Sequence, residues 1–122
     1  DALKAGKVRA IGVSNFYFDR FTDIADAMDI KPAINQIEAH VFCPQKKMQE
    51  VTSKYGTKLT AWGPLAEGRN GIFTHPLLSE IGTRYGKTAA QIALRYLTQQ
   101  DIIIIPKRNL RRLFRKLFLK LP

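Results

Sequence analysis

The stretch VRAIGVSNF (residues 8–16) begins as an apolar, strand-like run and ends in the polar pair Ser14-Asn15. The same arrangement returns three times, each time with residues typical of a buried strand followed by groups that hydrogen-bond, stack or carry charge. The runs lack the polar/apolar alternation of half-exposed strands, which is typical of parallel strands covered on both faces. The three later stretches are AINQIEAH (33–40), KLTAWGPLAEG (58–68) and DIIIIPKR (101–108).

Helical patterns separate these predicted strands. Pro76 is suited to open one helix and Thr88 to cap the next, while Gly56 and Gly86 are suited to stop the helices before them. With a last helix at the end of the chain, the order is β-α-β-α-β-(α)α-β-α, which predicts an α/β fold with a parallel sheet. Apolar residues recur at helical spacing in the segments 21–28, 48–55, 78–85, 89–96 and 110–121.

Two parallel architectures compete for this order, an open doubly wound sheet and a closed (β/α)8 TIM barrel. The sequence has no GxGxxG fingerprint, which favours the barrel, and its polar groups follow several strands, where a barrel carries its chemistry. The 122 residues supply about four βα units, roughly half of a barrel of about 250 residues. The opening DALKAGK (1–7) is typical of the last turn of a helix already under way, and together these features suggest a fragment. Because a half-barrel leaves two sheet edges unpaired, we expect marginal stability or dependence on a partner half.

The composition excludes several classes of protein. With 45% hydrophobic and 25% charged residues, the chain is typical of folded domains rather than disordered ones. The lone Cys43 excludes an internal disulfide framework and predicts a reducing, cytoplasmic location. No apolar run approaches the roughly 18 residues that a membrane span needs. The net charge of +10 is concentrated at the C-terminus, where no acid lies among residues 107–120 and the cations are Lys107, Arg108, Arg111, Arg112, Arg115, Lys116 and Lys120.

Each polar strand end has a structural alternative as well as a functional reading. Ser14 and Asn15 are residues that also cap the start of a helix. The structural alternative for Gln36 is a buried amide whose hydrogen bonds the protein itself satisfies. For Glu38 it is an ion pair with a nearby lysine. Trp62 is of a type that most often packs in a core, although a tryptophan before Gly-Pro at a strand end can present its flat face to a ring.

Lys107 is a more specific candidate for a binding site than the other strand-end residues. Pro106 fixes its own φ and disfavours helical geometry at Ile105, so the lysine leaves the strand at a set angle beside a predicted helix start. A cation next to free backbone N–H groups makes a phosphate site. Together the four strand ends supply amides, an aromatic platform and a basic clamp, which match the carboxamide, the ring and the phosphates of a nicotinamide dinucleotide.

Five motifs in this order resemble the C-terminal half of the aldo-keto reductases, particularly bacterial members of the diketogluconate-reductase type. The resemblance covers about residues 1–107. It implies a partial aldo-keto reductase (β/α)8 barrel domain over 1–122, ending in an atypical basic amphipathic helix over 108–122. The motifs are GKVRAIGVSNF, PAINQIEAH, LTAWGPLAEG, YGKTAAQIALRYL and IIIIPK.

The resemblance assigns roles around NADPH. Ser14 and Asn15 match the pair that binds the nicotinamide carboxamide, and Gln36 matches the glutamine that assists them. Trp62 stands where an aromatic residue, commonly Tyr, stacks on the nicotinamide ring.

The resemblance also assigns the phosphate end of the cofactor. The loop Gly63, Pro64 and Leu65 matches the segment along the pyrophosphate, and Lys107 matches the lysine on the 2′-phosphate of NADPH. Arg108, or Arg112 after a one-residue slip, is within reach of the same phosphate.

The chain departs from the family at two points. The catalytic Asp, Tyr, Lys and His of the family lie upstream of anything that matches Asp1, so no catalytic residue and no metal ligand is predicted here. The second departure is the tail, where the family places an Arg six residues after the lysine and then Glu-Asn for the adenine. This chain has Leu113 and Lys116-Leu117 at those positions.

The resemblance implies an NADPH-dependent oxidoreductase that reduces aldehydes and ketones to alcohols, acting on a small-molecule carbonyl substrate and completed by the missing N-terminal half of the barrel. The fragment alone is expected to be inactive, and the parent enzyme is expected to bind neither nucleic acid nor membrane. The alternative is a non-enzymatic half-barrel whose basic helix binds an anionic membrane or nucleic acid. A decayed half-barrel without function is a third possibility.

Overall fold

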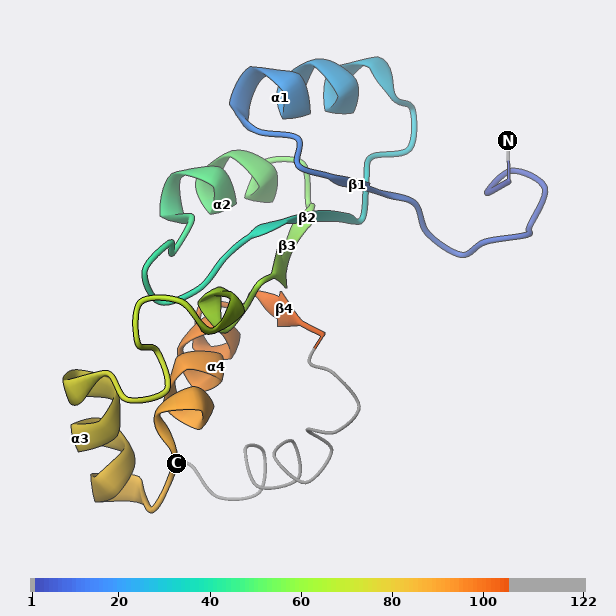
Figure 1. The fold of residues 1–122 in the computed structure, drawn as a ribbon. Helices are drawn as coiled ribbons and strands as arrows, with labels where there is room; N and C mark the ends of the chain where they lie inside the picture. The colour runs from blue at the N-terminus through green and yellow to red at the C-terminus, as the bar shows by residue number, and fades with distance from the viewer. Residues whose placement is uncertain (1, 106–122) are drawn as a thin grey trace.

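The computed structural model of the protein describes residues 2–105, so the predicted helix over 108–122 and the candidates Lys107 and Arg108 lie outside the described residues. The described part contains one parallel sheet whose strands follow the chain in the order β1-β2-β3-β4 (Figure 1). The strands are β1 (Gly12–Ser14), β2 (Ile34–Glu38), β3 (Lys58–Trp62) and β4 (Ile103–Ile104).

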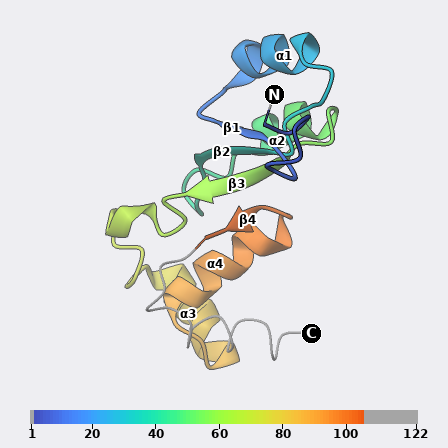
Figure 2. The same ribbon diagram turned by 90° about the vertical axis from the view of Figure 1, so that its right-hand side faces the viewer.

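Helices connect these strands in the predicted order. One helix joins β1 to β2, one joins β2 to β3, and two helices lie between β3 and β4 (Figures 1 and 2). A short 3₁₀ turn, η1 (Ala66–Gly68), follows β3. The helices are α1 (Phe18–Ala27), α2 (Lys46–Ser53), α3 (Pro76–Tyr85) and α4 (Ala89–Gln99).

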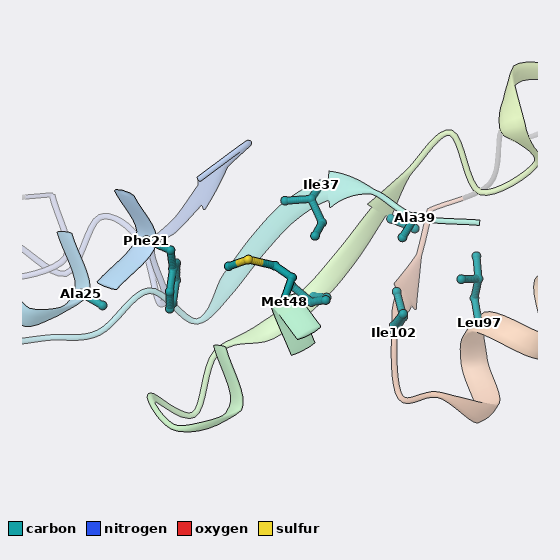
Figure 3. Close-up of a cluster of buried hydrophobic side chains, with 9 residues drawn as sticks. Phe21, Ala25, Ile37, Ala39, Met48, Leu97 and Ile102 are labelled. Atoms are coloured by element: carbon teal, nitrogen blue, oxygen red, sulfur yellow. The ribbon is translucent and has the colours of Figure 1, made fainter. Parts of the chain in front are cut away.

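The main core shows which side of the sheet the helices cover. Buried side chains of α1, α2 and α4 meet those of β2 and β3 in one cluster (Figure 3). A doubly wound sheet reverses its strand order and carries helices on both faces, whereas these strands keep sequence order and these helices share one face. The prediction of half a (β/α)8 barrel is therefore confirmed. The cluster consists of Phe21, Ala25, Ile37, Ala39, Met48, Leu59, Ala61, Leu97 and Ile102.

The helix boundaries follow the predicted capping chemistry. Pro76 occupies the first turn of α3, and Gly86 ends that helix in the left-handed conformation with φ of 61°. Thr88 caps α4 through a complete capping box with Gln91, in which the backbone N–H of Gln91 donates to Thr88 Oγ1 over 3.2 Å. Gly56 lies three residues beyond the end of α2, also at positive φ.

The turn between α3 and α4 is tightly packed. A Cβ added to Gly82 would lie 2.4 Å from the carbonyl oxygen of Lys87, a distance that real Cβ atoms do not show. The backbone N–H of Lys87 donates to the carbonyl of Gly82 over 2.8 Å. Only glycine therefore fits at position 82 while the two helices keep this connection.

The first residues of the chain form turns rather than a strand or helix. Lys7 N donates to Ala2 O over 2.9 Å and Gly6 N to Leu3 O over 3.0 Å, with Gly6 at φ of 70°. These two hydrogen bonds form a Schellman pattern. The first strand, β1, is shorter than the apolar run suggests. Among residues 2–105, no helix is long and apolar enough to cross a membrane.

Replacing Thr88 with Ala removes the acceptor of the α4 capping box, and we expect the free energy of unfolding to fall by about 1 kcal/mol. Urea unfolding followed by circular dichroism measures the change. Thr83→Ala is the matched control, because this exposed threonine hydroxyl only donates to Ser79 O within α3. Equal losses in the two variants would contradict the assigned cap.

Candidate functional site

The predicted strand-end residues lie on the sheet face opposite the main core. Successive side chains of a strand point to opposite faces. Since Ile37, Leu59 and Ala61 point into the core, Gln36 and Trp62 point to the other face. The parallel register aligns Ser14 with Gln36 on β2, and Glu38 with Trp62 on β3.

Ser14 and Asn15 are both tied to β2. The hydroxyl of Ser14 donates to the carbonyl oxygen of Gln36 over 2.9 Å, and the backbone N–H of Asn15 donates to the same oxygen over 3.0 Å. The alternative that this pair caps α1 is wrong, since the helix begins at Phe18 and its N-cap is Tyr17 without a side-chain cap. Asn15 has φ of 58°, a left-handed conformation that asparagine tolerates better than most residues.

Trp62 reaches across β2 to the end of β1. Its indole Nε1–H donates to Asn15 Oδ1 over 2.8 Å, although 47 residues separate the two in the chain. The ring is half-buried and belongs neither to the main core cluster nor to a second buried cluster. This second cluster consists of Ala66, Ile72, Leu78, Ala89 and Ala93. The alternative that Trp62 is a core residue is therefore wrong, and the ring instead stands beside the amide of Asn15.

The side chain of Gln36 is half-buried, and its amide makes no hydrogen bond to any residue among 2–105. The alternative of a satisfied buried amide is therefore wrong for the described part of the chain. Thr60 is the residue of β3 that lies directly opposite Gln36 in the register. Its Oγ1 is buried and also has no hydrogen-bond partner among residues 2–105. Gln36 and Thr60 thus place two polar side chains next to each other on this face without a hydrogen-bond partner among residues 2–105, available to a bound molecule.

Asn35 is a positioning residue that the sequence reasoning missed. Its side chain is fully buried on the core face, and Nδ2 donates to Phe16 O over 2.6 Å. This bond fixes the backbone directly after Asn15. The available signal was the pair Asn35-Gln36 within one strand, because adjacent strand residues face opposite sides and therefore need different partners.

Glu38 is held by a histidine rather than by the lysine named as its alternative partner. Its Oε1 lies 3.2 Å from His40 Nε2, and Phe42 N donates to His40 Nδ1 over 3.2 Å. Because Nδ1 accepts, the proton of a neutral ring is on Nε2 and points at the carboxylate. His40 thus fixes the loop after β2.

Cys43 lies in the same loop, with Gln45 Nε2 3.3 Å from its sulfur. Partial burial, and secondarily the negative charge of Glu38, raise the pKa of the thiol, which Gln45 partly offsets. The thiol is therefore a poor nucleophile near neutral pH. No group of three potential metal ligands occurs among residues 2–105.

The loop after β3 continues the predicted site. Gly63 has φ of 60°, and its carbonyl accepts from Ala66 N over 2.7 Å, which turns the chain through Pro64 and Leu65 into η1. Leu65 packs against the second buried cluster, so this residue contributes its backbone and anchors the loop.

Two amides, an aromatic ring and a turning backbone thus lie at the carboxyl ends of neighbouring parallel strands in a half-barrel. The chain belongs to the aldo/keto reductase family, whose family model matches residues 1–113. Members of this family are oxidoreductases that use nicotinamide cofactors and act on small-molecule carbonyl compounds.

Curated relatives and solved structures agree with this family. The chain is 42% identical over 104 residues to the uncharacterized oxidoreductase YtbE of Bacillus subtilis, covering 85% of this chain and 36% of that protein. It is 38% identical to aldose reductase C of Dictyostelium discoideum, covering 86% of this chain and 33% of the relative.

Among solved structures, the chain is similar to the aldose reductase of Schistosoma japonicum, with a TM-score of 0.84, 36% identity, and coverage of 97% of this chain and 38% of the other. A protein assigned as 2,5-diketo-D-gluconic acid reductase B matches with a TM-score of 0.85, 40% identity, and coverage of 96% and 41%. The chain therefore spans between about a third and two fifths of the length of these relatives.

Replacing Asn15 with Gly removes the acceptor of the indole while keeping the left-handed backbone, and we expect Trp62 to become more accessible to water. Acrylamide quenching of the single tryptophan should increase relative to the parent chain. Ser14→Ala is the control, because this change removes a neighbouring hydrogen bond to β2 but leaves the indole bond. An unchanged quenching constant in Asn15→Gly would contradict the Trp62–Asn15 contact.

The raised pKa of Cys43 predicts slow alkylation. At pH 8 a raised pKa leaves less thiolate than an ordinary cysteine has, so iodoacetamide should react several times more slowly with the folded chain than with the urea-unfolded chain. Glu38→Gln removes a negative charge and should speed the reaction of the folded chain. Glu50→Gln, on the exposed side of α2, should leave the rate unchanged.

Proposed function

We propose that the chain carries the cofactor-binding half of an NADPH-dependent reductase of aldehydes and ketones. The observation that supports this best is the convergence of Asn15, Gln36 and Trp62 at neighbouring strand ends, with the Gln36 amide left without a partner among residues 2–105. A carboxamide has a donor and an acceptor that suit such amides, and an aromatic ring suits stacking.

Each residue has a distinct part in this proposal. Asn15 and Gln36 would hydrogen-bond the carboxamide, Ser14 would fix the strand end that carries Asn15, and Trp62 would support one face of the nicotinamide ring. The segment Gly63–Leu65 would follow the pyrophosphate. NADPH supplies the hydride when it is bound, and the residues orient the ring so that the transfer occurs at short range.

The phosphate end of the proposal rests on Lys107 and Arg108. A lysine and an arginine beside each other suit the dianionic 2′-phosphate that distinguishes NADPH from NADH. Both follow β4 by a few residues in the sequence. The family's adenine contacts have no counterpart in this tail, so we expect weaker binding than in the relatives.

We propose that the Asp, Tyr, Lys and His of the family come from an upstream half of the barrel, which would also line most of the substrate pocket. The chain of 122 residues would then bind cofactor without reducing substrate. The free thiol of Cys43 fits a cytoplasmic setting for the parent enzyme. Nothing among residues 2–105 favours the alternative of a nucleic-acid or membrane module.

Cofactor binding is tested by titrating the fluorescence of Trp62 with NADPH and with NADH. NADPH should quench the emission, and Gln36→Ala should weaken its binding about fivefold, which corresponds to a lost hydrogen bond of about 1 kcal/mol. Gln99→Ala, the same change on exposed α4, should have no effect. Lys107→Ala should weaken NADPH and leave NADH unchanged, and quenching that all variants share equally would refute the proposed site.

A further inference from the structure

Helices α3 and α4 enclose a groove that none of the strand-end residues lines. Its cavity volume is about 480 Å³. Leu77 and Tyr85 at its margin are 57% and 54% exposed. The wall from α3 contains Leu77, Leu78, Ile81 and Tyr85, and the wall from α4 contains Ile92, Arg95 and Tyr96.

Arg95 is the only charged residue in this apolar lining. Its Nε is buried and has no hydrogen-bond partner among residues 2–105. A buried donor left unsatisfied costs about 1–3 kcal/mol, so a structure that keeps one has a reason to gain an acceptor there.

The protein itself offers Arg95 no carboxylate within the described part. Helix α4 contains no Asp or Glu, and Glu80 of α3 is paired with Arg84. The remaining ion pairs of residues 2–105 join Lys58 to Asp101, Arg69 to Glu67 and His40 to Glu38. No carboxylate of residues 2–105 is therefore recorded as a partner of Arg95.

We propose that the α3–α4 groove binds a small amphiphilic monocarboxylate. The apolar chain or ring would lie between Ile81 and Ile92, and the carboxylate would accept hydrogen bonds from the guanidinium of Arg95. The volume falls in the range of small-molecule pockets, about 300–1,000 Å³. A carboxylate is the planar acceptor that a guanidinium matches with two parallel hydrogen bonds.

The charge of the groove selects the carboxylate over other anions. One cation in an apolar lining balances one negative charge, whereas a phosphate dianion needs at least a second cation or several backbone donors. An uncharged alcohol of the same length gains the apolar contacts but cannot satisfy the ion. This inference does not depend on the proposed cofactor site.

Decanoate, kept below its micelle concentration, serves as the probe in calorimetric titrations of the full chain, and 1-decanol serves as the uncharged comparison. We expect decanoate to bind at a single site and decanol to bind at least about tenfold more weakly, as expected for loss of a charged hydrogen-bonded pair. Arg95→Met keeps the apolar length of the side chain and removes the charge, and it should weaken decanoate about tenfold. Arg95→Lys should restore part of the affinity.

Arg84→Met is the matched control, because Arg84 is exposed on α3 and is paired with Glu80. It should leave decanoate binding unchanged, and circular dichroism should show that all variants keep the helices. Equal binding of decanol and decanoate, or equal affinity of the parent and Arg95→Met, would overturn the proposal. A groove closed by a second copy of the chain would also overturn it, and would appear as a dimer in sedimentation that excludes decanoate.

Discussion

The carbonyl oxygen of Gln36 is the point on which the strand-end site depends. It accepts hydrogen bonds from both the Ser14 hydroxyl and the Asn15 backbone, so it decides where β1 ends and where the next backbone turn begins. From the opposite face of the same strand, the side chain of Asn35 donates to the carbonyl oxygen of Phe16, the residue after Asn15. Two adjacent residues of β2 thus hold one loop from two sides, and the indole of Trp62 meets an amide whose position is already set.

This arrangement depends in turn on the parallel register. Because side chains alternate along a strand, a one-residue slip of β2 would send Gln36 into the core and Ile37 to the polar face. The cluster around Ile37 and Leu59 opposes such a slip, since the slip would take the fully buried side chain of Ile37 out of the core. Core packing and site geometry are therefore two results of the same pairing.

Much of this was predictable from the sequence, for identifiable reasons. Strand and helix order, the capping role of Thr88 and the ending of α3 at Gly86 follow from local chemistry, and local chemistry is what a sequence records best. The gathering of Asn15, Gln36 and Trp62 followed from a topological rule about parallel strands.

The contacts between distant residues were harder to predict. Nothing local indicates that Asn15 would accept from an indole 47 residues away rather than cap the next helix, or that Glu38 would meet His40 instead of a lysine. Both choices depend on the curvature of the chain after each strand. The resemblance to a family supplied the roles of these residues, whereas the hydrogen bonds became visible only in three dimensions.

The close approach of Gly82 to the Lys87 carbonyl has a consequence for the neighbouring helices. A side chain at residue 82 would have to displace this carbonyl, so the small volume of glycine lets the end of α3 approach the start of α4 this closely. A larger residue at position 82 would therefore move the two helices apart and change the shape of the α3–α4 groove.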